Sequence, residues 1–468
     1  MYPTYLLLSV FIPFLGSVFI WFLKGKLRNA WAILITVSSL IFICLLYPPL
    51  LKGKIVAATI PILNSSMVNI AFIGDGIGFI FAVVFSFLGS VAIIYSFEYM
   101  KDSPHLNEYY SMTTLMVGSL VGLAFSKNLI LIYIFWEIAS LTTWRLVGFH
   151  RGQKETAIAN KTFLMIFAGS SLMLLGFIMI YAQARSFDLE MLKNVSVSNP
   201  ILLLILSGIV AKSAVLPVHN WLPDAHTTAP SPMSALLSGI VVKIGLLVFL
   251  RIFCYTFNIG WNWILLLAVL SSIVAASAAL LEKDMKKIIA YSTVSQTGYI
   301  LLGFAVMSKL GITAGLLYFI VHAISKSGLF LCAGIVEQTC GTREIDKMGG
   351  LIKVMPITGT AFIFCALSII GMPPFAGFFS KLTIIMSIIQ EGHMGIAILA
   401  VFSAILTLLY LLRLFNAIFL GNHECTRIKH KPKVMITCAL SLGIISLMIG
   451  LGIHNILRVI NQSVTCLF

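Results

Sequence analysis

Apolar residues run through this chain in long, uninterrupted stretches that short polar segments separate. Several stretches reach the roughly 20 residues that a helix needs to cross the hydrocarbon core of a bilayer. Because the stretches are continuous and do not alternate with polar residues, they predict membrane-spanning helices and exclude a β-barrel. We expect an all-α, multi-pass membrane protein with about fourteen spans. The spans lie near residues 4–23, 30–47, 77–97, 110–126, 128–149, 162–183, 200–217, 230–252, 261–281, 288–307, 312–336, 353–392 (broken), 394–420 and 434–457.

The composition agrees with this interpretation. Charged residues make up 10% of the chain and hydrophobic residues 59%, whereas soluble domains carry about 25% charged residues. The net charge of +15 is explained by basic loops on one membrane face, so we expect no nucleic-acid partner. The eight cysteines show neither CxxC pairs nor iron–sulfur spacing. A phosphate-binding nucleotide loop is also absent from the sequence. We therefore expect no cofactor or metal on this chain.

Lysine and arginine are distributed unevenly between alternate loops, 17 on one side and 8 on the other. The richer side carries Lys24, Lys26, Arg28, Lys101, Arg151, Lys154, Lys161, Lys283, Lys286, Lys287, Arg343, Lys347, Lys353, Arg427, Lys429, Lys431 and Lys433. The poorer side carries Lys52, Lys54, Lys127, Arg185, Lys193, Arg251, Lys309 and Arg458. The richer side is predicted to be cytoplasmic, with both termini on the opposite face of an energy-transducing cell membrane. The N-terminal stretch has no basic leader, so we expect a first transmembrane helix and not a cleaved signal.

The remaining basic residues fall inside predicted spans. They are Arg145, Lys212, Lys243, Lys326, Lys381 and Arg413. A lysine at the centre of a membrane helix costs about 2.5–3.5 kcal/mol on insertion scales, so such residues indicate function. Lys212 lies about 18 Å along its helix, from a rise of 1.5 Å per residue. Snorkelling of Lys212 to the nearer interface and a structural ion pair at Lys243 stay open as alternatives. Glu137 is a lone central carboxylate, for which we expect a lysine partner.

Two spans are predicted to be broken by proline, and both have a lysine near the break. Pro217 and Pro223 interrupt the seventh span after Lys212, and Pro373 and Pro374 interrupt the twelfth before Lys381. Broken helices are tolerated in membranes where the freed backbone lines a cavity or packs on protein.

The eleventh span adds His322 and Lys326, four residues apart on one helix face. Histidine titrates near neutral pH and therefore suits a proton relay, although a packing histidine is the alternative.

Five helices separate the two breaks, and an odd offset inverts orientation. Spans 4–8 (residues 110–252) and 9–13 (residues 261–420) are therefore predicted to be inverted repeats. Residues 1–109 would hold the first three spans and residues 421–468 the last one. A line of buried groups would cross the bilayer plane, consisting of Glu137, Lys212, Lys243, His322, Lys326 and Lys381.

The segment AKSAVLPVHNWLPDAHTTAPSPMSALLSGIVVKIGLLVFLRI resembles the signature of the antiporter-like subunits of respiratory complex I. The same superfamily includes membrane subunits of energy-converting hydrogenases and of multisubunit sodium/proton antiporters. The resemblance covers roughly residues 110–400. It implies fourteen core helices with helices seven and twelve broken. The chain stops soon after its last predicted span, so it resembles the shorter members without a lateral helix.

The resemblance also implies roles for single residues. Glu137 is similar to the fifth-helix glutamate that pairs with the seventh-helix lysine, here Lys212. Lys243 is similar to the central residue of helix eight and Lys381 to the terminal residue of helix twelve. His322 and Lys326 resemble the pair on helix eleven. The loop with His219, Asp224 and His226 resembles the segment that shapes the cytoplasmic access route. Arg145 departs from the family pattern, which puts the pairing of Glu137 in question.

These features predict a proton-translocating subunit of a membrane-bound redox complex of the dehydrogenase or hydrogenase type, with sodium as an alternative ion. The chain itself has no redox site. Iron–sulfur, flavin or nickel–iron centres would lie on a hydrophilic redox arm, beside homologous antiporter-like membrane subunits. Two alternatives stay open, namely a subunit of a multisubunit sodium/proton antiporter and an independent transporter of a small solute.

Overall fold

The computed structural model describes residues 1–60, 69–421 and 432–465, and most of them are helical. The predicted loop residues Arg427, Lys429 and Lys431 lie outside the described residues. Eleven helices in the described part are long and apolar enough to cross a membrane. The helix α5 and the two broken helices complete the fourteen predicted spans.

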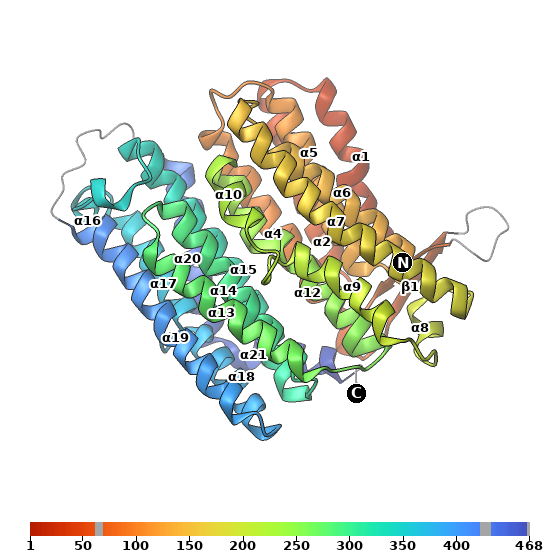
Figure 1. Cartoon of the computed structure of the whole chain (residues 1–468). Coiled ribbons are helices and arrows are strands. Elements are labelled where there is room, and N and C mark those ends of the chain that lie inside the picture. The colour runs from red at the N-terminus through yellow and green to blue at the C-terminus, as the bar shows by residue number, and fades with distance from the viewer. Residues whose placement is uncertain (61–68, 422–431, 466–468) are drawn as a thin grey trace.

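Figure 1 shows the helices as a slanted bundle. The spans are α1 (Tyr2–Phe19) with η1 (Ile20–Phe22), α2 (Gly25–Cys44), α4 (Gly76–Tyr99), α5 (Leu106–Phe125), α6 (Leu129–Val147), α7 (Gln153–Ala184), α9 (Asn199–Lys212) with α10 (Trp221–Thr228), α11 (Ser231–Leu236) with η2 (Leu237–Val241), α12 (Lys243–Phe249) and η3 (Leu250–Thr256), α13 (Asn262–Leu281), α14 (Met285–Ala305), α15 (Lys309–Cys340), α17 (Pro356–Ile370) with α18 (Ala376–Gln390), α19 (Met394–Phe415) with η5 (Asn416–Leu420), and α20 (Lys433–Leu451). The other elements are α3 (Tyr47–Leu51), β1 (Val56–Ile60), β2 (Ile70–Gly74), α8 (Leu189–Leu192), η4 (Ile345–Lys347), α16 (Leu351–Val354) and α21 (Ile453–Val464).

Three spans form the centre of the bundle. In the span Ser231–Thr256, 100% of the most apolar 18-residue window is buried. The buried share of the corresponding window is 94% in both α14 and α15. The corresponding value is only 33–39% for α1, α2, α7 and α19, whose apolar faces are left for lipid or other protein. The central spans carry Lys243, His322 and Lys326, so these ionisable groups lie far from the lipid.

The two predicted repeats share an unusual backbone feature. In the first repeat, Leu129 N–H donates to Phe187 O and Leu189 N–H donates to Lys127 O. In the second, Met285 N–H donates to Arg343 O and Ile345 N–H donates to Lys283 O. Each of these four residues in the second repeat lies 156 residues after its counterpart in the first repeat, as Lys127 and Lys283 illustrate.

Other elements of the repeats also correspond. The third span of each, α7 and α15, has 32 residues. The fourth span of each is broken, and the fifth ends in a π-helical segment. The chain ends lie toward the same end of the bundle (Figure 1), as an even number of spans requires.

Three details differ from the sequence-based expectations. The last span was predicted to reach residue 457, but α20 ends at Leu451 and Gly452 separates it from α21. The helix α21 is amphipathic, because Asn455, Arg458 and Asn461 interrupt its apolar positions. A two-stranded antiparallel hairpin, β1 with β2, was not predicted at all.

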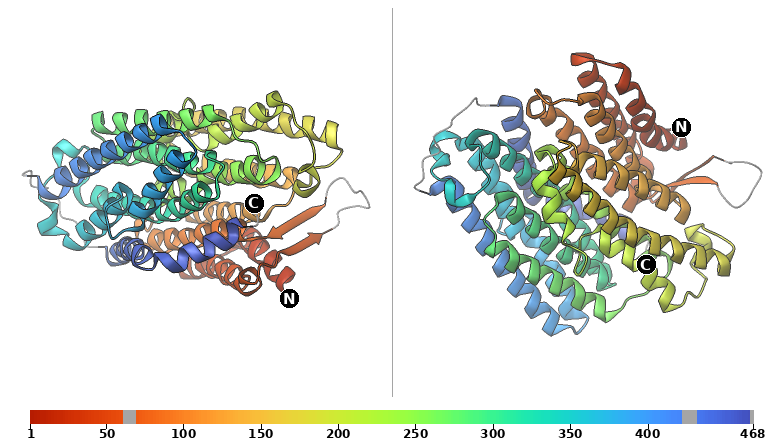
Figure 2. Two further views of the ribbon diagram at one scale, coloured as in Figure 1. Left: turned by 90° about the horizontal axis from the view of Figure 1, so that it is seen from below. Right: turned by 45° about the horizontal axis from the view of Figure 1, so that its top comes forward.

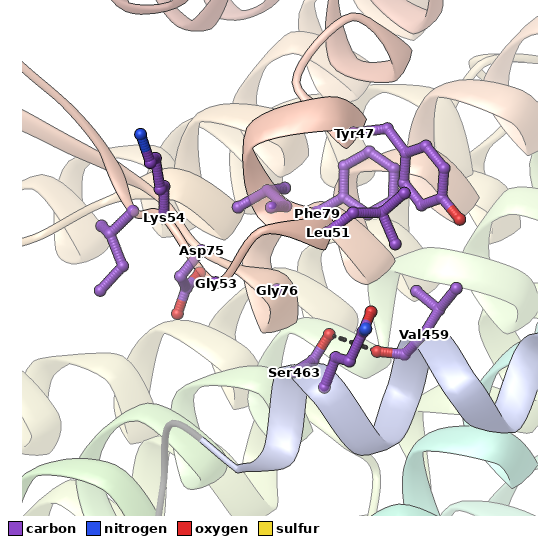
Figure 3. A pocket seen from close by; sticks show the side chains of 12 residues that line it. Tyr47, Leu51, Gly53, Lys54, Asp75, Gly76, Phe79, Val459 and Ser463 are labelled. Atoms are coloured by element: carbon purple, nitrogen blue, oxygen red, sulfur yellow. Dashed lines mark hydrogen bonds between the residues drawn. The ribbon is translucent and has the colours of Figure 1, made fainter.

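The helix α21 packs against the start of α4, where the two backbones approach closely. A Cβ atom added to Gly76 would lie 2.2 Å from Ser463 Oγ, so only glycine fits there. Figure 3 shows the small pocket of about 30 Å³ beside this contact, with Tyr47 and Phe79 on one side and Val459 and Ser463 on the other. In the right view of Figure 2, the green-to-teal spans lie between the red-to-yellow spans on one side and the light-blue α18 and α19 on the other, whereas α20 packs against α4.

Candidate ion-translocation site

Lys212 is the last residue of α9 and is fully buried at the point where the seventh span breaks. The break comprises residues 213–220 and contains Pro217. It starts earlier than the sequence predicted, directly after Lys212 rather than at the proline. Ala214 has the left-handed backbone angle φ +50°, a conformation that persists only where the surrounding packing imposes it.

Lys212 interacts electrostatically with Glu137, but its described hydrogen bond goes to a residue one turn away. Lys212 Nζ donates a hydrogen bond to Ser140 Oγ at 2.8 Å. Ser140 lies three residues after Glu137 on α6 and therefore on the same face of that helix. Glu137 is partly buried, and its Oε1 has no hydrogen-bond partner among the described residues. Lys212 thus contacts α6 through Ser140, one turn from Glu137.

Arg145 does not compete for Glu137, in contrast to the doubt that the sequence raised. Its Nε atom donates to Glu108, and its Nη1 atom donates to Gly148 O at 3.1 Å. Arg151 contacts the same Glu108 carboxylate at 2.7 Å. Arg145 is therefore neutralised near the end of its span.

Lys243 is fully buried and begins α12 directly after the π-helical segment η2. Its Nζ atom donates to the carbonyl oxygen of Ser238. π-helical segments occur frequently at functional sites, because they redirect side chains and free backbone carbonyls. The same span approaches the break of the seventh span closely. A Cβ atom on Gly245 would lie 2.1 Å from Ser213 Oγ, which brings the segments of Lys243 and Lys212 together.

Lys326 is held between α14 and α15. Its Nζ atom donates to Ile289 O at 3.1 Å and to the hydroxyl of Ser292. The next residue of α14 is Thr293. Its hydroxyl donates to the same Ile289 carbonyl and also lies 2.7 Å from Ser238 Oγ. A continuous set of polar contacts therefore joins the backbone that holds Lys243 to the ammonium group of Lys326.

From Lys326 the polar contacts continue toward the twelfth span. Ser292 Oγ lies 2.6 Å from the hydroxyl of Tyr410, and Gln296 Nε2 donates to that same hydroxyl at 3.3 Å. The hydroxyl of Tyr318 donates to Gln296 Oε1. These residues come from α14, α15 and α19 and are fully buried. The polar connection thus reaches Tyr318 without passing through solvent.

Lys381 lies at the far end of this connection. It is 4% exposed and sits in the second turn of α18, just after the break at residues 371–375 that contains Pro373 and Pro374. Its Nζ atom lies 5.0 Å from the ring centroid of Tyr299 and 5.5 Å from that of Tyr318. Its hydrogen bond to Ile370 O is 3.4 Å long. The aromatic faces attract the ammonium group and keep it in place.

Two buried histidines have no hydrogen-bond partner among the described residues. Both ring nitrogens of His322 are unpaired, and so are both of His226. His322 interacts electrostatically with Lys243, Lys326 and Lys381, which places it among the predicted relay residues. His226 stacks on Phe330 at a centroid distance of 4.3 Å. A buried polar group without a partner costs free energy unless water or a transferred proton satisfies it.

The predicted access residues divide into two groups. His226 is buried and interacts with Lys286, Lys326 and Lys243, so it faces the relay. Asp224 is partly exposed and pairs with Lys161 at 2.7 Å. His219 lies in the break near Pro217 and is partly exposed.

A polar cleft of about 470 Å³ opens beside His226. It is lined by His150, Glu155, Lys286, Glu337 and Arg343, among others. Lys286 was predicted to be a loop residue, but its side chain is 3% exposed and pairs with Glu337 at 2.8 Å. Both residues of this pair line the cleft, and Lys286 interacts electrostatically with His226.

One further basic residue was misplaced by the sequence analysis. Arg251 was predicted to lie in a loop, but it is 2% exposed within η3. It makes two hydrogen bonds to the carboxylate of Asp75, one of them 2.7 Å long, and a third to Ala124 O at 2.9 Å. This buried pair joins the start of α4 to the end of the eighth span.

These features define a multi-pass membrane protein with a buried line of titratable side chains between two broken helices. The chain belongs to the family described as NADH:quinone oxidoreductase/Mrp antiporter, transmembrane part, which matches residues 126–407. Residues 61–110 match the N-terminal part of chain 5 of NADH-ubiquinone oxidoreductase (complex I). The predicted family membership is thereby confirmed.

Several characterised proteins are similar over nearly the whole chain. A Na⁺/H⁺ antiporter subunit of Alkalihalophilus pseudofirmus is 32% identical over 487 residues, which cover 95% of this chain and 60% of that protein. The corresponding Na⁺/H⁺ antiporter subunit of Staphylococcus haemolyticus is 32% identical with the same coverage. The chain thus spans about 60% of the length of these relatives.

Two solved structures share the fold. A chain of the Mrp complex from a Dietzia species superposes with a TM-score of 0.91 at 23% identity, covering 99% of this chain and 97% of that chain. A chain of the membrane-bound sulfane sulfur reductase, an archaeal respiratory complex, gives a TM-score of 0.90 at 22% identity with the same coverage. The fold therefore occurs in both an antiporter complex and a respiratory complex.

Proposed function

We propose that this chain is a proton-translocating subunit of a multisubunit sodium/proton antiporter in the cell membrane. The relatives at 32% identity are sodium/proton antiporter subunits, which favours this alternative over the redox-complex subunit that the sequence analysis put first. An independent solute transporter is disfavoured, because the buried ionisable groups form a line and do not converge on one pocket.

The observation that carries the proposal is the buried polar connection from Lys326 to Tyr318, whose ring lies beside Lys381. Lysine ammonium groups and hydroxyl groups exchange protons, and a buried amide orients the hydroxyl groups beside it. Ser292, Tyr410 and Tyr318 supply the hydroxyls, and Gln296 holds two of them. Cavity water between these groups would complete the path, as in other intramembrane relays.

Protons would reach the relay through the polar cleft beside His226. The Lys286–Glu337 pair lines the cleft and Lys286 interacts with His226, so opening this pair would admit water to the unpaired imidazole. Glu137 and Lys212 would form the first repeat's part of the relay, together with Ser140. Moving a carboxylate away from a buried lysine weakens the hold of the lysine on its proton, and such a displacement would drive transfer. The cytoplasmic position of the cleft follows from the positive-inside pattern.

Sodium would be exchanged by the assembled complex. Carboxylates, the ligands that sodium favours, are scarce in the spans of this chain, which supports protons as its own ion. Other membrane subunits, including homologous ones, would therefore be partners. If the chain served a redox complex instead, the iron–sulfur, flavin or nickel–iron centres would belong to its partners.

The test is ion exchange in the absence of an electron donor. The complex would be purified through an affinity tag on this chain and reconstituted into liposomes that contain a pH-sensitive dye. We expect a sodium gradient to move protons, and a potassium gradient of equal size to move none. Proton movement that occurs only with an electron donor, and not with sodium, would assign the chain to a redox complex.

A further inference from the structure

A cleft at one end of α6 and α7 combines two arginines with an exposed indole. It has a volume of about 240 Å³ and is lined by Trp144, Arg145, Gly148, Arg151, Thr156 and Ala159. None of these residues belongs to the proposed relay. The cleft opens on the outside of the bundle, since Trp144 is 37% exposed and the neighbouring Leu141 is 50% exposed.

The cleft lies at the level of the lipid headgroups. The helix α7 has 32 residues, which corresponds to about 48 Å at 1.5 Å per residue, whereas the hydrocarbon core is about 30 Å thick. Centring α7 leaves roughly 9 Å, or six residues, beyond the core at each end. Ala159 then lies at the edge of the hydrocarbon, and Thr156 and Arg151 lie in the headgroup layer. Tryptophan is enriched at this level, as Trp144 is here.

The charge balance of the cleft is positive. Arg145 and Arg151 share the single carboxylate of Glu108, so one positive charge is left over. Arg151 has five N–H donors, and its described hydrogen bond to Glu108 uses one nitrogen. Its side chain is 51% exposed, so the remaining donors are free to bind a ligand from outside. A guanidinium group matches the geometry of a phosphate, which it binds through two parallel hydrogen bonds.

An apolar track continues from the cleft toward the middle of the membrane. The ring of Phe163 packs against Trp144 at 6.2 Å and against Phe167 at 5.4 Å. Phe167 is 42% exposed and Leu164 is 62% exposed, both on the outer face of α7. A positive cleft in the headgroup layer above an apolar track suits a molecule that has an anionic head and hydrocarbon chains.

We propose that this cleft binds the phosphate group of an anionic membrane lipid, whose acyl chains lie along the Phe163–Phe167 surface of α7. The cleft selects the headgroup by charge, because a zwitterionic headgroup brings its own cation next to the two arginines. Glu108 holds the arginines in place and at the same time competes with the lipid phosphate. The lipid site is independent of which ion the complex transports.

The test measures quenching of Trp144 by brominated lipids. The purified complex would be placed in vesicles of brominated phosphatidylglycerol or brominated phosphatidylcholine. The signal of Trp144 among the seven tryptophans is obtained as the difference from the Trp144→Phe variant. We expect phosphatidylglycerol to quench Trp144 more effectively, and Arg151→Gln to weaken this preference about fivefold.

Two further variants keep the result interpretable. Lys26→Gln removes an exposed positive charge at the same end of the bundle, and we expect it to leave the preference unchanged. Glu108→Gln removes the competing carboxylate, and we expect a stronger preference, a gain that a misfolded protein cannot produce.

Three outcomes would overturn the proposal. The first is equal quenching of wild-type Trp144 by both lipids. The second is an equal loss of preference in Lys26→Gln and Arg151→Gln, since general surface charge would then explain the result. The third is loss of the preference in a few millimolar inorganic phosphate, which would assign the cleft to a soluble anion and not to a lipid.

Discussion

Removal of one hydroxyl group from Tyr318 tests whether the polar connection is an ion path. Tyr318→Phe keeps the ring that faces Lys381 at 5.5 Å but removes the donor to Gln296 Oε1. Tyr318, whose ring contacts the twelfth-span lysine, then loses its hydrogen bond to α14. Tyr299→Phe is the matched control, because its ring faces the same Lys381 at 5.0 Å while its hydroxyl donates to the backbone oxygen of Ala400.

The magnitudes follow from the two hydroxyl environments. Both tyrosines are 0% exposed. Tyr318→Phe leaves Gln296 Oε1 without its donor, at a cost of about 1–3 kcal/mol. Tyr299→Phe leaves Ala400 O with its helical N–H donor in α19, so the thermal stability of the complex should fall less in this variant. A cost of the same size in the barrier to proton transfer lowers the rate by about 5- to 150-fold. Only Tyr318→Phe should show this loss.

The assay is the initial rate of sodium-driven proton movement in liposomes, divided by the amount of assembled complex. We expect Tyr299→Phe to stay within about twofold of wild type and Tyr318→Phe to lose at least about fivefold. Equal rates in the two variants would refute the reasoning, because the Gln296 link would then have no part in transport.

Two other predictions concern pairs outside the relay. Asp75→Asn leaves Arg251 without its buried partner, and we expect the complex to lose about 3–5 kcal/mol of stability. Replacing both residues by leucine should recover most of this loss in denaturant titrations, and a double variant as unstable as the single one would contradict the assignment. Arg145→Gln should leave proton transport within about twofold of wild type, because Arg145 pairs with Glu108 and not with Glu137. A transport rate as low as that of Glu137→Gln would show that the arginine acts on the relay.

Much of the fold could be predicted from the sequence, because membrane spans and helix breaks depend on local residue patterns. Continuous apolar runs located the fourteen spans, although α7 begins nine residues before its predicted start, and Pro217 and the Pro373–Pro374 pair marked the two breaks. The buried lysines were also visible, since a charge within an apolar run needs no tertiary information to be recognised.

The contacts between helices could not be predicted in this way. Ser140, Ser292 and Gln296 resemble ordinary small or polar residues within apolar spans, and only packing reveals that they meet the lysines. The seventh span also ends before its proline, and the described hydrogen bond of Lys212 goes to Ser140 and not to Glu137. Polar residues in the middle of α14, which is 94% buried over its most apolar window, were the signal that could have indicated the network.

Basic residues near span ends were assigned to loops for a similar reason. Lys286 and Arg251 lie close to predicted boundaries, where hydropathy alone does not distinguish a buried pair from a solvated charge. Their partners lie on other elements: Glu337 is near the end of the next span, α15, and Asp75 directly precedes α4. Long-range pairing of this kind depends on the arrangement of the bundle.

The most direct measurement of the central claim compares two substitutions on the same helix. Lys326→Met removes the buried ammonium group that contacts Ser292, and Lys309→Met removes an exposed one at the start of α15. Sodium-driven proton movement would be measured for each assembled complex in liposomes. If the buried line is the ion path, Lys326→Met abolishes transport and Lys309→Met retains it. Transport at the wild-type rate in an assembled Lys326→Met complex would contradict the account.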